Sequence, residues 1–362
     1  MPYTTSSSSP FLQACAGQVP SRKPIWLMRQ AGRILPAYRQ LRSQYQSVSE
    51  LFDSPELASR ITLMPVEQLG VDAAILFTDL VTPLKALGVH YRYQPGPVLE
   101  RPIRHRSDMQ TLTARSLDAS LNHVLETVRR VRAGLPPEVA LIGYAGAPFT
   151  LAAWLVEGQA TRDLSVLRRL LFCNPVLAHE LLERLAVLAA EFLQAQIEAG
   201  AQAVQLFDTS VGMLGPVHFR EFALPYVCRV FEQLDTAGVP RIYFPLAAPH
   251  LLPWLPPSGA DVLSLDWRTP LDTLYARLDP AFPLQGNLDP CALFAPVAQL
   301  DQAIDAVLAS AADRPHIFNL GHGVLPDTPL AQVRRLVERV HNSGTGAAGN
   351  QTPELSGDAA HG

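Results

Sequence analysis

The 362-residue chain has few cysteines, almost no lysine and no long hydrophobic run. Its four cysteines are far apart and form no C-x-x-C pair, which argues against a disulfide framework and against a clustered zinc site. No apolar stretch approaches the length of a membrane span, and the Ser/Thr-rich start lacks a signal-peptide pattern. These absences predict a cytoplasmic protein that enters no membrane and holds no metal ion.

Charge is nearly balanced, with 29 Lys and Arg residues against 33 Asp and Glu residues and a formal net charge of −4. Such a chain has no global basic field of the kind that holds nucleic acid, so any anion site must be local. Only Lys23 and Lys85 are lysines, and the other 27 basic residues are arginines, whose planar forks suit carboxylates and phosphates. A coding bias that also enriches Ala and Pro explains most of this excess, so position must decide which arginines are functional.

Both ends of the chain are predicted to lie outside the folded domain. Residues 1–20 are expected to be flexible, residues 21–341 to form one domain, and residues 342–362 to be a disordered tail. Residues 344–349 match the glycine-rich dinucleotide fingerprint, but no apolar strand leads into them. We therefore expect no nucleotide site in the tail.

Short apolar runs alternate with helical patterns along the chain. Continuous apolar strands between amphipathic helices favour a parallel sheet covered by helices. Eight such units predict an α/β fold, a single (β/α)8 TIM barrel with its active site at the C-terminal ends of the strands. An open, doubly wound sheet is the alternative. The eight runs cover residues 24–28, 73–77, 140–144, 203–207, 241–244, 262–265, 282–284 and 317–320, and the clearest helical stripes cover residues 121–131, 177–197 and 330–340.

Two arginines follow the first run. Arg29 and Arg33 flank the small pair Ala31 and Gly32, which would let backbone N–H groups approach a ligand closely. Arginines on the solvent face of a helix are the simpler interpretation, although positive charge is disfavoured at a helix N-terminus. The position after a strand makes this segment a candidate anion site.

Polar side chains also follow later runs. Asp79 comes after the second run, although a role as a helix N-cap explains a lone acid equally well. Small residues over 143–150 follow the third run and lead to Trp154, for which a core role is the usual interpretation. His322 stands between two glycines after the eighth run, which favours contact with a ligand over a structural role. Further polar residues after the fourth, sixth and seventh runs are Asp208, Thr209, Ser210, Asp266, Asn287 and Asp289.

The chain contains no metal-ligand motif, no phosphate-binding loop and no G-x-S-x-G nucleophile motif. The predicted chemistry therefore uses Arg, Asp, hydroxyl and His side chains without a cofactor.

Four segments together resemble the uroporphyrinogen decarboxylase family. They are residues 24–33, 143–151, 285–290 and 319–323, and the resemblance extends over about residues 24–341. It implies a single-domain (β/α)8 barrel, a homodimer, and an enzyme that needs neither metal nor organic cofactor. The implied reaction is the stepwise decarboxylation of the four acetate side chains of the tetrapyrrole uroporphyrinogen III to give coproporphyrinogen III, in haem biosynthesis.

The resemblance also implies roles for particular residues. Arg29 and Arg33 would bind substrate carboxylates, with close backbone contacts from Gln30, Ala31 and Gly32. Asp79 would face the pyrrole N–H groups and stabilise the positive charge of the transition state. His322 would contact a substrate side chain. Trp154 and Thr209 would line the substrate site.

Three positions depart from the family's usual residues. Trp154 stands in place of Tyr, Thr209 in place of Ser, and Leu246 in place of Lys. Trp154 and Leu246 keep open a non-catalytic, tetrapyrrole-binding paralogue as the alternative function. A zinc-dependent methyltransferase of the same fold is a further alternative, which would need a cluster of His and Cys ligands.

Overall fold

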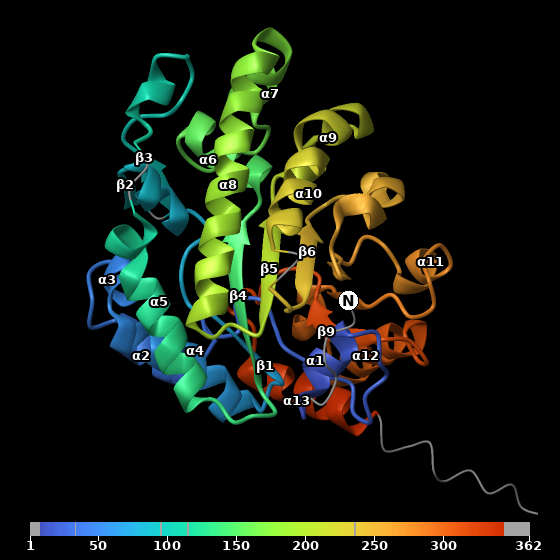
Figure 1. Ribbon diagram of the computed structural model, residues 1–362. Coiled ribbons are helices and arrows are strands. Elements are labelled where there is room, and N and C mark those ends of the chain that lie inside the picture. The colour runs from blue at the N-terminus through green and yellow to red at the C-terminus, as the bar shows by residue number, and fades with distance from the viewer. Residues whose placement is uncertain (1–7, 33, 95, 114–115, 235–236, 344–362) are drawn as a thin grey trace, which may run out of the picture.

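The structure, a computed structural model, describes residues 8–32, 34–94, 96–113, 116–234 and 237–343. In these residues a curled sheet of seven strands has the order β1-β4-β5-β6-β7-β8-β9, and every neighbouring pair is parallel. A separate antiparallel hairpin, β2 and β3, lies apart from it (Figure 1). The strands are β1 (Ala73–Ile75), β2 (Tyr91–Tyr93), β3 (Pro97–Leu99), β4 (Ala140–Gly146), β5 (Ala203–Asp208), β6 (Arg241–Pro245), β7 (Val262–Ser264), β8 (Leu284–Leu288) and β9 (His316–Leu320).

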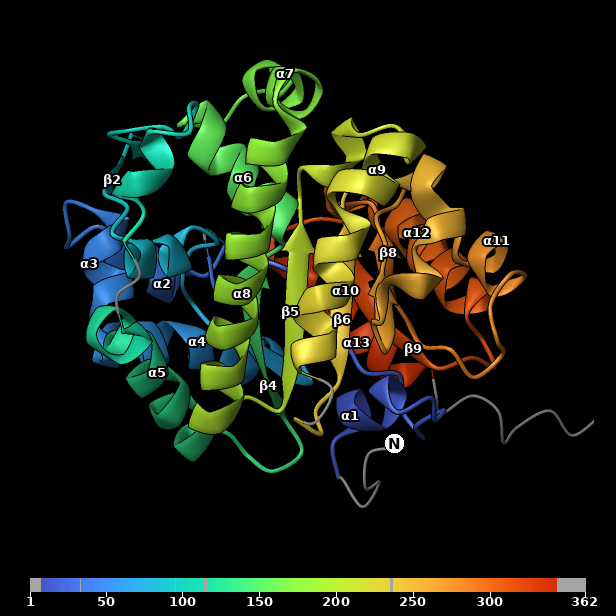
Figure 2. The ribbon, with the colours of Figure 1, turned by 45° about the horizontal axis from the view of Figure 1, so that its top comes forward.

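Helices surround this sheet, and Figure 2 shows α8 and α10 in front of β4, β5 and β6. The α-helices are α1 (Pro10–Cys15), α2 (Pro36–Arg42), α3 (Val48–Asp53), α4 (Pro55–Leu69), α5 (Leu117–Gly134), α6 (Pro148–Glu157), α7 (Ser165–Cys173), α8 (Pro175–Ala199), α9 (Pro216–Phe222), α10 (Leu224–Gln233), α11 (Leu271–Tyr275), α12 (Val297–Ser310) and α13 (Leu330–Asn342). The 3-10 helices are η1 (Thr82–Leu87), η2 (Asp108–Thr111), η3 (Val211–Met213), η4 (Pro249–Trp254), η5 (Pro256–Ser258) and η6 (Pro290–Phe294).

The two edges of the sheet are joined by the segment around Ile25. Ile25 bridges Phe318 of β9, and the Phe318 N–H donates to the Pro24 carbonyl at 2.8 Å. On the other side, the Asp72 N–H donates to the Ile25 carbonyl at 2.8 Å, directly before β1. This closure confirms the α/β barrel class that the alternating pattern predicts.

The first of the eight predicted strands is, however, reduced to that single bridge. Pro24 has no N–H to donate, and the Ile25 N–H donates to the side chain of Asp72 at 2.7 Å instead of to a neighbouring strand. The expectation of a full strand over residues 24–28 is therefore wrong. The apolar run is buried, as in a strand, but its backbone hydrogen bonds do not form the regular ladder of a β-sheet.

The seventh predicted strand is displaced toward the C-terminus. Residues 282–284 are the expected strand, whereas β8 is Leu284–Leu288 and includes the polar residues Gln285 and Asn287. Inside the barrel, Gln285 accepts from Trp26 Nε1 at 2.9 Å and donates to Ser264 Oγ at 2.8 Å. Hydrogen bonds inside the barrel thus allow a strand to contain residues that a hydrophobicity pattern assigns to a loop.

The three predicted helical stripes form α5, α8 and α13. In α8, Asn174 Oδ1 accepts from the Leu177 N–H at 3.2 Å, Pro175 is the first helical residue, and Gly200 follows the helix with φ 122°. No helix among the described residues is long and apolar enough to cross a membrane.

The N-terminal segment differs from the expectation. Residues 10–15, within the stretch 1–20 expected to be flexible, form α1, and Phe11 of this helix is completely buried. At the other end, α13 ends at Asn342, while residues 344–362, including the fingerprint at 344–349, lie outside the described residues.

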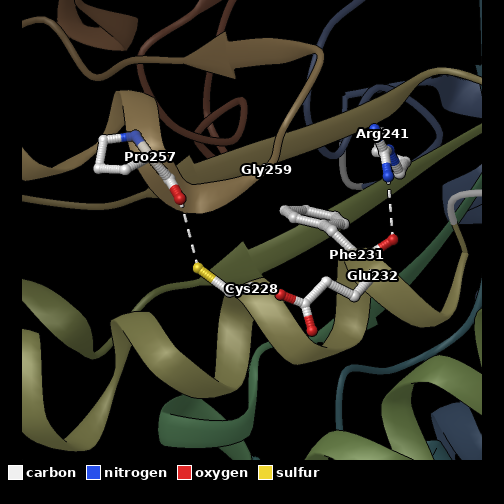
Figure 3. A pocket seen from close by; sticks show the side chains of 6 residues that line it. All are labelled: Cys228, Phe231, Glu232, Arg241, Pro257 and Gly259. Carbon is white, nitrogen blue, oxygen red and sulfur yellow. Dashed lines mark hydrogen bonds between the residues drawn. The ribbon is translucent and has the colours of Figure 1, made fainter. Parts of the chain in front are cut away.

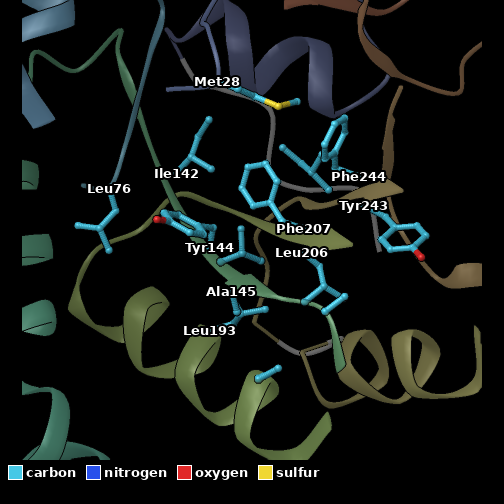
Figure 4. Packing of buried hydrophobic residues seen from close by; sticks show 14 of the residues in the cluster. Met28, Leu76, Ile142, Tyr144, Ala145, Leu193, Leu206, Phe207, Tyr243 and Phe244 are labelled. Carbon is cyan, nitrogen blue, oxygen red and sulfur yellow. The ribbon is translucent and has the colours of Figure 1, made fainter. Parts of the chain in front are cut away.

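Core residues alternate between the two faces of the sheet. Figure 4 shows Tyr144 and Phe207 on one face, with ring centroids 5.3 Å apart. Ala145 and Leu206 lie on the opposite face, toward Leu193 of α8. This alternation directs every second side chain at the ends of β4 and β5 into the barrel mouth.

Candidate active site

Arg29, Asp79 and His322 lie together at the C-terminal ends of the strands. Arg29 has a positive φ of 61° and its side chain lies along Gly323, so closely that a Cβ on that glycine would be 2.4 Å from Arg29 Cδ. The Arg29 charge lowers the pKa values of both Asp79 and His322, which places it near both groups. The structure thus brings together one cation, from the loop after the Ile25 bridge, with one acid and one imidazole that follow β1 and β9.

Asp79 lies between β1 and η1 and is partly buried. Burial raises the pKa of its carboxyl, while the Val81 N–H, the Tyr93 hydroxyl and the charge of Arg29 each oppose this shift. The Val81 N–H donates to Asp79 Oδ1 at 3.1 Å, so the side chain also shapes the turn that enters η1. The Asp79 carboxyl therefore stabilises the turn that enters η1 and is also part of the candidate site.

Three tyrosines surround Asp79. Tyr93 of β2 donates a hydrogen bond to the carboxylate, Tyr91 lies beside Tyr93 with ring centroids 5.8 Å apart, and the Tyr144 hydroxyl of β4 donates to the Thr78 carbonyl. Burial, followed by the charge of Asp79, raises the pKa of all three hydroxyls, so they stay protonated. Sequence reasoning missed the hairpin tyrosines. The alternation of Tyr91 and Tyr93 is the signal that could have found them.

His322 follows β9 and is partly buried. Burial lowers the pKa of its imidazole, and the charge of Arg29 lowers it further. The ring is therefore neutral near pH 7 and offers one donor and one acceptor nitrogen.

The loop after Met28 is held by its own hydrogen bonds. Gln30 is completely buried: its Oε1 accepts from the Leu27 N–H at 2.9 Å and its Nε2 donates to the Ala73 carbonyl at 2.9 Å. The backbone N–H groups of Gln30 and Gly32 donate to the carbonyls of Leu27 and Arg29 at 3.0 and 3.1 Å. These groups fix the loop that presents Arg29.

Ala31 and Arg33 belong to the same loop. Ala31 is 6% exposed, which leaves little of it for a ligand to touch. Arg33 lies outside the described residues, so its carboxylate-binding role stays a prediction.

A buried acid joins α6 to the loop after β5. Asp208 accepts from Thr150 Oγ1 at 2.7 Å and from the Tyr243 hydroxyl at 2.9 Å. The Ser210 N–H in turn donates to Thr150 Oγ1 at 3.1 Å. Burial raises the Asp208 pKa to about 6.

Trp154 and Thr209 are placed by this network. Thr209 immediately follows Asp208, and Trp154 lies one helical turn after Thr150 on α6; both side chains are half-buried. Thr209 thus directly follows β5, and Trp154 lies on the helix that follows the neighbouring strand β4, so their place in the substrate site stays a prediction. Leu246, the third departure, follows β6, and its N–H donates to the Asp208 carbonyl at 3.1 Å.

A surface pocket of about 330 Å³ lies elsewhere, between α10 and η5 (Figure 3). Cys228 Sγ lies 3.3 Å from the Pro257 carbonyl, and Arg241 Nη1 donates to the Phe231 carbonyl at 2.9 Å. Arg241 is the first residue of β6, so this pocket lies at the N-terminal end of that strand, whereas Asp79 lies at the C-terminal ends of the strands. None of the predicted site residues lines the pocket. Within the described ranges no group of three or more His, Cys, Asp or Glu side chains could hold a metal ion.

Comparison with known proteins identifies the family. The family model described as uroporphyrinogen decarboxylase (URO-D) matches residues 6–343. A protein named uroporphyrinogen decarboxylase from Trichlorobacter lovleyi is 43% identical over 91% of this chain and 97% of its own length. One of the same name from Geobacter metallireducens is 42% identical over the same shares.

A solved structure shares the fold. The methyltransferase from Methanosarcina mazei superposes with a TM-score of 0.75 over 92% of this chain and 98% of its own, at 18% identity. At that identity the likeness concerns the fold alone. The family match and the two relatives cover nearly the whole chain, and the chain therefore belongs to the uroporphyrinogen decarboxylase family.

Proposed function

We propose that the chain removes the four acetate carboxyls of uroporphyrinogen III one after another and releases coproporphyrinogen III. It is a carboxy-lyase of porphyrin biosynthesis, as family membership over nearly its whole length and identities above 40% support. The observation that carries the mechanism is the partly buried Asp79 carboxyl, which accepts from Tyr93 and from the Val81 N–H and lies near the Arg29 charge.

The reaction breaks the bond between an acetate methylene and its carboxyl carbon. The electron pair moves into the pyrrole ring, which can accept it once the ring has been protonated, and carbon dioxide leaves. A proton then binds the methylene carbon in place of the lost carboxyl, and the ring releases the proton that it had accepted, so each decarboxylation consumes one proton in all. A fixed carboxylate opposite the pyrrole N–H groups stabilises the positive charge on the protonated ring, which is the role we assign to Asp79.

The substrate carries eight carboxylates, and the site offers fixed cations and neutral donors. Arg29 belongs to a loop that is held by hydrogen bonds, and its guanidinium can donate two hydrogen bonds to one carboxylate. His322 is neutral, so it donates a hydrogen bond to a substrate side chain without adding a charge. Arg33, Trp154 and Thr209 complete the proposed substrate site, and no metal or organic cofactor has a role in it.

An anaerobic assay with uroporphyrinogen tests this function. We expect the purified chain to give products with seven, six, five and finally four carboxyls, separated by chromatography. A chain that binds the tetrapyrrole but releases no carbon dioxide would be the non-catalytic paralogue instead. Tightly held zinc in stoichiometric amount would favour the methyltransferase.

We also propose a homodimer. Phe172 of α7, Val176 at the start of α8 and Val217 of α9 are 69%, 58% and 73% exposed, which is unusual for large apolar side chains. Phe172 and His218 of α9 lie with ring centroids 4.6 Å apart, so the two helices form one apolar surface. Figure 1 shows α7 and α9 beyond the C-terminal ends of β5 and β6.

A cytoplasmic location is a further proposal. The four cysteines are free thiols, and Cys173 and Cys291 are exposed, as is usual in a reducing compartment.

A further inference from the structure

The segment that carries His322 is enclosed on two sides. A Cβ on Gly321 would lie 2.4 Å from the backbone nitrogen of Trp267 and 2.9 Å from Cε3 of its ring. A Cβ on Gly323 would lie 2.4 Å from Cδ of Arg29. His322 therefore stands between Arg29 on one side and the loop after β7 on the other.

That loop presents a second arginine. The guanidinium carbon of Arg268 lies 4.2 Å from the centroid of the Trp267 ring, and its Nη1 donates to Asp266 Oδ2 at 2.9 Å. The Arg268 N–H donates to Asp266 Oδ1 at 2.8 Å. Stacking and ion pairing thus fix the direction of this side chain.

The support beneath Arg268 is buried while its guanidinium is not. Asp266 is 3% exposed in its side chain and Arg268 is 42% exposed. Asn287 of β8 donates to the carbonyls of Asp266 and Thr269 at 2.8 and 2.6 Å and so holds both ends of the loop. One N–H group of the Arg268 guanidinium donates to Asp266, so its other N–H groups can bind a ligand in the barrel mouth.

The charge of Arg268 reaches the same imidazole as that of Arg29. Both guanidinium groups lower the pKa of His322, after the larger effect of burial, whereas Asp266 raises it. A guanidinium group therefore lies near His322 on each side, and that of Arg268 is partly balanced by its ion pair with Asp266.

We propose that Arg268 binds a carboxylate of the substrate, on the side of His322 opposite Arg29, with Asp266 and Trp267 as its positioning residues. The inference rests on the proposed function, because it needs a substrate that presents several carboxylates around a ring. Arg29 follows the segment that joins β9 to β1, and Arg268 follows β7, so the two arginines face different side chains of one macrocycle. Leu246 lies in the same region, since Asp266 Oδ2 also accepts from the next residue's N–H, that of Ala247, at 2.6 Å.

The substitution Arg268→Gln tests this role, because Gln keeps a donor for Asp266 but loses the charge and the fork. With uroporphyrinogen under anaerobic conditions, we expect KM to rise about tenfold, as for a lost charge-assisted hydrogen bond, and kcat to change less than about twofold. Arg268→Lys keeps the charge and should show a smaller rise in KM.

Arg335→Gln is the matched control. Arg335 is 41% exposed and paired with Asp301 at 2.5 Å, but it lies on the outer helix α13. We expect its KM and kcat to equal those of the unaltered chain. A KM for Arg268→Gln equal to that of the control would overturn the inference, while an unaltered chain without any activity would overturn the proposed function instead.

A second measurement uses the unaltered protein and so does not depend on whether a variant folds. An arginine-modifying dicarbonyl is applied with and without excess uroporphyrinogen, and modified peptides are quantified by mass spectrometry. Substrate should slow the modification of Arg268 at least several-fold and leave Arg335 unaffected. Equal rates at Arg268 with and without substrate would contradict its contact with the ligand.

Discussion

At the scale of single residues, the site depends on opposing effects at Asp79. Burial raises the pKa of the carboxyl, and four groups oppose this shift: the Val81 N–H, the Tyr93 hydroxyl, the Arg29 charge and the Leu80 N–H. A carboxylate held in this way is poorly solvated and directed at one place, so it acts strongly on a nearby developing positive charge.

Replacing Asp79 by Asn removes the charge and keeps the shape. We expect kcat to fall by about 10²- to 10³-fold, because one preorganised electrostatic group is lost, while KM stays within a few-fold. Steady-state kinetics with uroporphyrinogen measure both. A variant that keeps most of the kcat would show that Asp79 is not the stabilising group.

Replacing Tyr93 by Phe removes one donor to the Asp79 carboxylate. The loss disfavours the anion, so the Asp79 pKa rises and the acid limb of the pH profile of kcat/KM moves to higher pH. Tyr226→Phe is the control, because the Tyr226 hydroxyl is hydrogen-bonded to His179 Nδ1 at 2.6 Å and not to Asp79. Identical profiles for the two variants would contradict the role of Tyr93.

Asp208 predicts a pH dependence of stability. Its pKa is about 6 in the folded chain and about 3.9 in an unfolded one, so the folded state binds the proton more tightly. Stability should therefore fall as pH rises from about 4 to 7, by about 3 kcal/mol from this group. Urea unfolding of Asp208→Asn, compared with the unaltered chain at pH 5 and pH 7.5, should show the difference. Parallel pH dependences in the two proteins would count against it.

At the scale of elements, two glycines in the loop after β9 are packed closely against different neighbours. A Cβ on Gly323 would meet the flexible side chain of Arg29, whereas one on Gly321 would meet the backbone of Trp267. The first substitution moves the side chain of Arg29, and the second must move the loop that carries Trp267.

We therefore expect different results for the two alanine variants. Gly323→Ala should raise KM by on the order of tenfold, because it displaces Arg29, with little loss of stability. Gly321→Ala should lower the free energy of unfolding by about 1–3 kcal/mol through overpacking. Kinetics and urea unfolding of both proteins provide the comparison, and a Gly323→Ala protein with normal KM would show that Arg29 need not lie along this residue.

The elements also show what a sequence can predict. The helices α5, α8 and α13 follow from apolar spacing and terminal signals, which depend on neighbouring residues only. The strand around Gln285 does not, because its burial depends on Trp26 and Ser264, which are distant in the chain. The positions of Arg29 and His322 could be predicted because each follows a buried apolar run. Tyr93 could not, because it reaches Asp79 from the β2–β3 hairpin, which is separate from the barrel sheet.

At the scale of the whole molecule, the apolar surface of α7, α8 and α9 predicts assembly. Val217→Asp and Phe172→Asp place charge on it and should convert a dimer into monomers, as measured by light scattering after gel filtration. Val19→Asp is the control, since Val19 is 54% exposed and precedes the segment that closes the barrel. If the unaltered chain is a monomer, or if all three variants remain dimers, this surface is not the interface.

In the proposed mechanism, the single partly buried carboxyl of Asp79 promotes all four decarboxylations of one substrate molecule. The most direct test counts the carbon dioxide released per uroporphyrinogen, anaerobically and with enzyme in excess, for the unaltered chain and for Asp79→Asn. We predict four molecules per macrocycle from the unaltered chain, and far slower release from the variant although it binds the substrate. Equal rates from the two proteins, or no release from the unaltered chain, would contradict the account.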